Sequence, residues 1–339
     1  MMLALGVDAG GTASRAVVAG PDGKILGRGS AGPGNPTSAG CEAARSIGTA
    51  IRAALGDRDP QSVRAVVAGV AGVGILADPA IAAAFAAEWA AIGLTCPITT
   101  VGDAVSAFAA GTPAASGAVL IAGTGAVAAR IENWRITRTA DGLGWLLGDE
   151  GSGLWLGLQA IRAVARLQTS TQDGLAARIA AHTGAGSRDE LVQWAGRQPP
   201  PAFAELAPLV CASARAGDPL ARRLTTEAGT RLLATLSELD SVAEPSAAPA
   251  PTGPSALGPI AEPSAALAPT GPVVLAGGLL TADTPIRTTV LEALTNRGTP
   301  TATAHDPATG AAWLAIRQAA DLNDRAAAHL HALMLGDRR

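Results

Sequence analysis

Two short segments of the 339-residue chain place glycines and a threonine directly after an apolar stretch. The first is Asp8-Ala9-Gly10-Gly11-Thr12, and the second is Gly123-Thr124-Gly125. Glycines let backbone N–H groups approach an anion closely, and a threonine hydroxyl can donate to a phosphoryl oxygen. The carboxylate of Asp8 could hold Mg²⁺, mostly through water. Each segment alone is equally compatible with a tight turn, so the hypothesis of two phosphate-binding loops depends on their occurring together.

Acidic residues stand at two further points. Asp103 follows the apolar stretch 98–101, and the carboxyl ends of strands are where open α/β sheets place their ligands. The alternative for Asp103 is a helix N-cap ahead of Ala104, a common role for aspartate. In Gly148-Asp149-Glu150-Gly151-Ser152, two acids precede another apolar stretch. A cap needs only one side chain, so this segment favours contact with a ligand.

A pair of glycines, Gly277-Gly278, ends the apolar stretch 273–276. Without side chains, these positions would let an adenine or a ribose lie against the backbone. None of the glycine segments has the GxxxxGK[ST] pattern of a P-loop or the GxGxxG pattern of dinucleotide-binding proteins. The motifs therefore point away from both of these nucleotide-binding classes.

Strands that end at these segments are needed to position them. Three short stretches at the start of the chain, separated by turn residues, predict a meander of antiparallel strands. Helices and strands then alternate up to Asp103, which predicts an α/β domain with a mixed sheet. The expected strands are residues 3–7, 16–19, 24–28, 63–68 and 98–101, and the expected helices are residues 42–55 and 79–92.

A second unit begins near Ser116 and repeats this order. The apolar stretch 119–122 enters the Gly123-Thr124-Gly125 segment, and a strand is expected at 127–131. Strand, glycine-threonine turn and strand also begin the chain, which predicts an internal duplication with one phosphate loop in each lobe. We therefore expect lobes at residues 1–115 and 116–339. Further elements are expected as helices at 153–167, 175–182, 187–196, 219–239, 285–296, 309–320 and 324–335, with a strand at 273–276.

A Pro/Ala/Ser repeat interrupts the second lobe at about residues 243–271. The sequence AEPSAAPAPTGP recurs there with one substitution, eighteen residues later. Such a segment cannot bury a core or sustain a strand ladder. It predicts a disordered or polyproline-like surface insertion.

Composition excludes several classes of protein. The formal net charge is −3 and the basic residues are scattered, which argues against a nucleic-acid partner. No apolar run reaches the roughly 18–20 residues of a membrane span, and no basic region precedes the N-terminal apolar stretch. We therefore expect a cytoplasmic protein with no membrane partner. Cys41, Cys96 and Cys211 lie far apart, so no disulfide, zinc or iron–sulfur site is expected within one chain.

The order and spacing of these segments resemble the sugar-kinase, heat-shock-protein and actin superfamily. Within it, the chain is similar to the N-acetylglucosamine kinases and to the bacterial ATPases named for activators of benzoyl-CoA reductase and hydroxyacyl-CoA dehydratases. The stretch LLGDEGSGLW, residues 146–155, is the most specific part of the resemblance. The resemblance implies an α/β, two-lobed actin-like ATPase fold, related to ribonuclease H, in which duplicated mixed sheets are flanked by helices. It also implies ATP and Mg²⁺ as cofactors.

The resemblance also implies a role for each site residue. Asp103 would be the general base on a sugar hydroxyl, and Asp8 would lie near Mg²⁺. The phosphate loops would be Gly10, Gly11 and Thr12 in the first lobe and Gly123, Thr124 and Gly125 in the second, with Gly277 and Gly278 at the adenosine. The sugar contacts would be Asn35, Asp103, Gly142, Asp149 and Glu150.

The activity implied is phosphorylation of an amino sugar, N-acetylglucosamine or glucosamine, at O6. Two departures concern the pocket around the sugar's C2 substituent. Ala126-Val127 stands where the animal-type kinases have an asparagine, and Asp141-Gly142-Leu143-Gly144 stands where they have Gly-Gly-Trp-Gly. Free glucosamine or a muramic-acid-type sugar therefore remains a competitor, and Asp141 would suit an ammonium group if it faces the pocket.

A different class of function is an ATP-hydrolysing activator of a redox partner enzyme. Activators of this kind hold an iron–sulfur cluster across a dimer through paired cysteines, and this chain has no such pair. The partner expected for the kinase is a small-molecule sugar, with a homodimer as a possible assembly.

Overall fold

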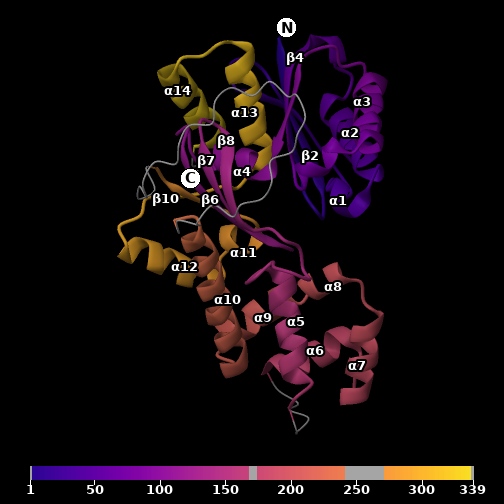
Figure 1. The fold of residues 1–339 in the computed structure, drawn as a ribbon, viewed down its shortest axis with the longest axis vertical. Helices are drawn as coiled ribbons and strands as arrows, with labels where there is room; N and C mark the ends of the chain where they lie inside the picture. The colour runs from indigo at the N-terminus through magenta and orange to yellow at the C-terminus, as the bar shows by residue number, and fades with distance from the viewer. Residues whose placement is uncertain (1, 168–173, 241–270, 337–339) are drawn as a thin grey trace, which may run out of the picture.

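The computed structural model describes residues 2–167, 174–240 and 271–336. Nearly all of the insertion predicted at about residues 243–271 lies outside the described residues. The described chain forms two five-stranded sheets with helices around and between them (Figure 1).

The two sheets have the same topology. The first has the order β3-β2-β1-β4-β5 and the second has the order β10-β9-β6-β7-β8. In each, three strands form an antiparallel meander, a fourth strand pairs in parallel with the first strand of the meander, and a fifth pairs in parallel with the fourth. The bounds are β1 Leu3–Ala9, β2 Ser14–Ala19, β3 Ile25–Ala31, β4 Val63–Val70, β5 Ile98–Gly102, β6 Gly117–Ala122, β7 Ala126–Glu132, β8 Arg135–Asp141, β9 Val273–Ala276 and β10 Thr301–Thr303. The predicted duplication of a mixed sheet is confirmed.

Two helices lie between the sheets. These are α4 (Asp103–Gly111) and α13 (Pro307–Ala319), and one hydrophobic cluster joins them to residues of both sheets, such as Val67 and Val274. Trp313 of α13 is fully buried in this cluster. Since α4 runs directly into the second lobe and α13 returns to the first, the two lobes share this layer.

Missing side chains let the middle layer pack closely. A Cβ at Gly6 in β1 would come within 2.1 Å of the backbone nitrogen of Ala312 in α13. A Cβ at Gly310 in α13 would come within 2.6 Å of the backbone nitrogen of Ala110 in α4. Glycines at these two positions therefore allow α13 to approach β1 and α4 backbone to backbone.

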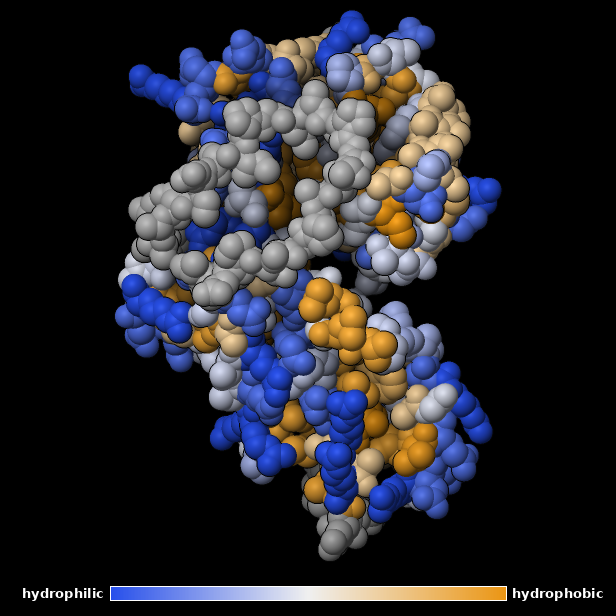
Figure 2. Space-filling model, viewed as in Figure 1, coloured by the Kyte–Doolittle hydropathy of each residue, from blue (hydrophilic) through white to orange (hydrophobic). Residues whose placement is uncertain are grey.

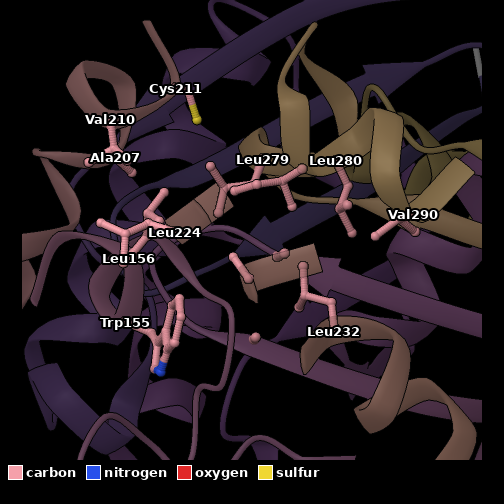
Figure 3. Close-up of a cluster of buried hydrophobic side chains, with 14 of the residues drawn as sticks. Trp155, Leu156, Ala207, Val210, Cys211, Leu224, Leu232, Leu279, Leu280 and Val290 are labelled. Atoms are coloured by element: carbon pink, nitrogen blue, oxygen red, sulfur yellow. The ribbon is translucent and has the colours of Figure 1, made fainter. Parts of the chain in front are cut away.

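The outer faces of the sheets are covered by the remaining helices. The first sheet carries α2 (Glu42–Leu55) and α3 (Pro79–Ile92), and α14 (Asp324–Leu335) packs beside α13. The second sheet carries a helical layer in which Leu156, Leu224 and Leu280 belong to one apolar cluster (Figure 3). Its helices are α5 Gly153–Val164, α6 Gly174–Thr183, α7 Arg188–Arg197, α8 Pro200–Ala204, α9 Ala207–Arg215, α10 Pro219–Glu238, α11 Gly278–Thr281 and α12 Pro285–Asn296.

Some elements were not expected from the sequence. The strand β8 alternates exposed and half-buried residues, and β10 has only three residues, so neither contains an apolar run. Both are edge strands that exist because a neighbouring strand offers hydrogen-bond partners. The helix α9 was also missed, and the helix expected at 153–167 ends at Val164.

Candidate active site

The two glycine-threonine segments meet across the molecule. The first forms the turn between β1 and β2, and the second forms the turn between β6 and β7. The hydroxyl oxygens of Thr12 and Thr124 lie 3.0 Å apart, although the residues are 112 positions apart in the chain. The duplicated sheets therefore direct equivalent loops toward one place.

Several glycines of these loops face open space. A Cβ at Gly11 or Gly278 would meet no atom within 4 Å, and one at Gly10 or Gly123 would make only an ordinary contact. None of the four has a positive φ. Neither packing nor backbone conformation requires glycine here, so these positions are suited to a ligand that approaches the backbone closely.

The second loop is fixed by the helix that follows it in space. The N–H groups of Gly153 and Leu154, at the start of α5, donate to the carbonyls of Gly123 and Thr124 at 2.8 and 3.1 Å. Within the described part of the chain, no acceptor is found for the N–H of Thr124. The loop thus turns its carbonyls toward α5 and leaves the N–H of Thr124 as a donor for an anion.

Gly277-Gly278 lies beside the second loop. Gly277 has a φ of +80°, and a Cβ there would come within 2.4 Å of the carbonyl oxygen of Ala122. Only glycine tolerates both the conformation and the contact. The end of β9 is thereby brought against the end of β6, where Gly278 begins α11 with open space around it.

Two carboxyl groups come together in the first lobe. Asp8 is the penultimate residue of β1, and Asp103 is the first residue of α4. The pKa of Asp8 is raised to about 7, chiefly by burial and also by the negative charge of Asp103, while Arg15, 3.7 Å away, acts in the opposite direction. Burial also raises the pKa of Asp103, although its hydrogen bond from the N–H of Ala104 lowers it. A divalent cation would relieve the repulsion between the two groups.

Asp103 also contributes to the start of helix α4, which is part of the alternative capping role. Gly102 occupies the N-cap of α4, so Asp103 stands one residue inside the helix. Its Oδ1 accepts a hydrogen bond from the N–H of Ala104 at 3.0 Å. The carboxylate therefore stabilises the helix start while lying close enough to Asp8 for their charges to interact.

Asn35 lies beside the first loop. It caps the short helix α1 (Pro36–Ala39), and its Oδ1 accepts a hydrogen bond from the N–H of Thr37 at 2.9 Å. The N–H of the preceding residue, Gly34, donates to the carbonyl of Gly10 at 2.9 Å. The cap leaves the side-chain NH₂ of Asn35 as the group able to contact a substrate.

The acidic turn is tied into the second lobe. The Oδ1 of Asp149 accepts a hydrogen bond from the N–H of Ala126 at 2.9 Å. Burial raises the pKa of Asp149, and the charge of Asp141 adds to this. Glu150 forms an ion pair with Arg231 of α10, whose guanidinium lies 4.9 Å from the centre of the Trp155 ring. Asp149 thus borders the second glycine-threonine loop, whereas the carboxylate of Glu150 is paired.

The carboxylate of Asp141 accepts hydrogen bonds from the backbone. Its Oδ1 accepts from the N–H of Asp149 at 2.7 Å, and its Oδ2 accepts from the N–H of Glu150 at 2.8 Å. Because both of its oxygens accept backbone hydrogen bonds, this carboxylate is not available to pair with an ammonium group. Gly142, with a φ of +72°, follows it and packs against the side chain of Val127.

An exposed apolar segment follows Gly142. Leu143, Trp145, Leu146 and Leu147 are 49–75% exposed. Figure 2 shows an apolar patch near the middle of the molecule and a hollow to its right, between the first lobe and the helices below. In Figure 1, α1 lies above this hollow and α8 lies below it.

Some groups of the site were not found from the sequence. Arg15 pairs in register with Asp8 across the β1–β2 hairpin, and this could have been read from the hairpin alone. The contacts of Arg231 and of Asp141 depend on tertiary packing. The three cysteines lie apart, with Cys41 exposed and Cys211 buried, and the described residues contain no group of three or more acids, histidines or cysteines placed to hold a metal ion.

Duplicated mixed sheets that bring two glycine-threonine loops to one place define an actin-like ATPase, which is the fold class expected. The chain belongs to the BadF/BadG/BcrA/BcrD ATPase family, whose sequence profile matches residues 5–315. Membership of this family confirms the resemblance and ATP as a ligand. No helix among the described residues is long and apolar enough to cross a membrane.

Known proteins are similar to this chain in sequence or in structure. An N-acetyl-D-glucosamine kinase of Dictyostelium discoideum is 25% identical over 244 residues, which are 67% of this chain and 76% of that protein. A candidate N-acetylglucosamine kinase from Chromobacterium violaceum matches with a TM-score of 0.69 at 24% identity, covering 93% of this chain and 99% of that one. A ROK family glucokinase from Streptomyces griseus, solved with glucose and AMPPNP, matches with a TM-score of 0.57 at 21% identity and the same coverage.

Proposed function

We propose that this protein is an ATP-dependent sugar kinase that phosphorylates an amino sugar, N-acetylglucosamine first, at O6. The proposal is carried by the meeting of Thr12 and Thr124, together with the pair of partly buried carboxyl groups of Asp8 and Asp103. Phosphoryl transfer needs little beyond positioning and neutralisation of charge. Two anion-binding loops and an acidic pair supply both.

The nucleotide would lie between the lobes. The phosphates would be held by the backbone of Gly11 and by the hydroxyls of Thr12 and Thr124, and the adenosine would lie against Gly278. Asp8 is placed to hold Mg²⁺, mostly through water, and the ion would neutralise charge on the phosphates. The open space at the loop glycines fits this arrangement.

Asp103 is the proposed general base. Its raised pKa makes its carboxylate a stronger proton acceptor than an ordinary aspartate. It would take the proton from the sugar hydroxyl as that oxygen attacks the terminal phosphorus in line. Closure of the lobes around both substrates would exclude water and limit hydrolysis of ATP.

The acceptor contacts come from both lobes. Asn35 would offer its side-chain NH₂, and Asp149 would offer Oδ2, which has no donor among the described residues. Gly142 would lie near the C2 substituent, and Glu150 would act from beside Asp149. Because Asp141 gives both oxygens to backbone N–H groups and the neighbouring segment is apolar, an N-acyl group is favoured over a free ammonium.

The test is a coupled assay of ADP release with glucosamine, N-acetylglucosamine, N-acetylmannosamine, muramic acid and glucose. The highest kcat/KM is expected for N-acetylglucosamine, and its 6-deoxy analogue is expected to be inert as an acceptor. Glucose or glycerol as the best substrate would overturn the amino-sugar assignment. Turnover of the 6-deoxy analogue would overturn the assignment of O6.

A further inference from the structure

Asp141 closes a loop between β8 and α5. It is the last residue of β8, with a φ of +59°, and its two carboxylate oxygens accept hydrogen bonds from the N–H groups of Asp149 and Glu150. A Cβ at Gly148 would lie 2.0 Å from the Oδ1 of Asp141, so any side chain at this position would displace the carboxylate. The nine positions from 141 to 149 are thereby pinned at both ends.

Asp149 carries the connection to the second phosphate loop. Its φ is +58°, and its Oδ1 accepts from the N–H of Ala126, the residue directly after the loop. A Cβ at Gly125 would lie 2.6 Å from the same oxygen. Two aspartates in the left-handed region, each seated against a glycine, indicate a geometry held by these hydrogen bonds rather than by backbone preference.

The same segment holds Ala126 from its other side. The N–H of Gly142, next to Asp141, donates to the carbonyl of Ala126 at 3.1 Å. Both backbone groups of Ala126 are therefore bonded to the segment that Asp141 closes. Any displacement of that segment moves the end of the loop that carries Thr124.

We infer that Asp141 is a positioning residue for the nucleotide: through Asp149 and Ala126 it holds the second phosphate loop in the geometry that receives the phosphates. This inference rests on the proposed function, because it assigns that loop to ATP. Asp141 would then support nucleotide binding and would not contact the sugar's C2 substituent.

The variant that tests it is Asp141→Asn. Asparagine tolerates a positive φ and keeps the size of the side chain. Its NH₂ group, however, cannot accept a hydrogen bond, so one of the two backbone N–H groups loses its acceptor. Removing one hydrogen bond to an ionised group from the loop's support is expected to weaken binding of Mg²⁺·AMPPNP by roughly tenfold, measured by calorimetry without sugar. The KM for ATP is expected to rise by about the same factor, with kcat at saturating ATP changed less than about threefold.

A matched control exists in the same lobe. Asp218, away from the phosphate loops, also accepts backbone hydrogen bonds with both oxygens, from Leu175 and Ala221, and also lies against a glycine, Gly174. Asp218→Asn should cost similar stability and leave nucleotide affinity within about twofold of wild type.

The outcomes separate the two proposals. Suppose that the wild type binds AMPPNP. The positioning role alone would then be overturned if Asp141→Asn bound AMPPNP with unchanged affinity, or if Asp218→Asn lost as much affinity as Asp141→Asn. A wild-type protein that binds no nucleotide would overturn the proposed function and this inference with it. Asp141→Gly, which suits the positive φ and removes both acceptors, serves if the asparagine variant does not fold and should bind AMPPNP at least as weakly.

Discussion

At the scale of single residues, the site depends on partly buried acids and on glycines whose missing side chains leave open space. Asp8 and Asp103 are 95 positions apart in numbering, yet the charge of one raises the pKa of the other. Burial strengthens such interactions because the surroundings polarise less than water does. Each residue therefore has a role that can be separated from fold stability by substitution.

Asp103→Asn should abolish most turnover without unfolding the protein. Asparagine keeps an oxygen for the N–H of Ala104 but cannot accept a proton. Turnover is expected to fall by about 10²–10⁴-fold, the range for losing a positioned acid–base group. The free energy of unfolding should change by no more than about 1 kcal/mol. Near-normal turnover with a large loss of stability would make Asp103 a structural residue only.

Gly11→Ala should act on the nucleotide alone. The new methyl group meets no protein atom within 4 Å and φ is not positive, so stability should stay the same or rise by up to about 1 kcal/mol. If a phosphate approaches this backbone, the KM for ATP should rise by at least about tenfold, or roughly 1.4 kcal/mol. Gly196→Ala, at an equally open position in α7, is the control and should leave KM unchanged. An unchanged KM in Gly11→Ala would contradict a phosphate contact there.

At the scale of elements, the middle layer links the site to the end of the chain. Helix α4 begins at Asp103, and its carbonyl at Ala109 lies 2.9 Å from Nε2 of His331 in α14. The ring of His331 also packs edge-on against Trp313 of α13. The C-terminal helices therefore contact the helix that carries the proposed base.

His331 should make the protein less stable in acid. Burial lowers the pKa of its imidazole below the usual 6.5, against the opposing effect of the hydrogen bond to Ala109. The unfolded chain then binds more protons, so stability is complete above about pH 6.5 and is lost as the pH falls toward the folded pKa, by about 1.4 kcal/mol for each unit of lowering. His331→Gln keeps a donor for Ala109 without titrating. Its urea unfolding should depend less on pH between about 5.5 and 7.5 than that of wild type; equal dependence would contradict this role.

At the scale of the whole molecule, the two lobes touch through the loops that are proposed to hold phosphates. The hydroxyl groups of Thr12 and Thr124 share a hydrogen bond. A nucleotide between the loops would have to replace this contact. The relative position of the lobes is therefore expected to respond to ATP.

Cysteines at these two positions should report that response. In Thr12→Cys/Thr124→Cys, made with Cys41→Ser to remove the exposed thiol, mild oxidation is expected to join the lobes. The two sulfur atoms would replace hydroxyl oxygens that lie 3.0 Å apart, which is close to the distance at which a disulfide forms. Mg²⁺·ATP should slow this cross-link, scored by intact mass and gel mobility. Each single cysteine variant is a control and should not cross-link within the chain. A rate unaffected by nucleotide would place ATP elsewhere.

The sequence by itself determined the elements and the chemistry of the motifs. The expected helices 42–55, 79–92, 285–296 and 324–335 coincide with α2, α3, α12 and α14, because periodicity and caps such as Asp78 and Thr284 act within a few residues. The glycine-threonine segments and Asp103 were likewise found at the ends of strands, as alternation of apolar and turn residues predicts.

Only the tertiary structure decided what these residues contact. The pairing of Glu150 with Arg231, the capture of Asp141 by backbone N–H groups and the return of α13 between the sheets all join segments that no local pattern connects. Edge strands such as β8 depend on a neighbour for their hydrogen bonds. The 3.0 Å between Thr12 and Thr124 depends on how both lobes pack against the shared helices α4 and α13. Distances of this kind follow from close packing of the whole chain, and sequence spacing does not encode them.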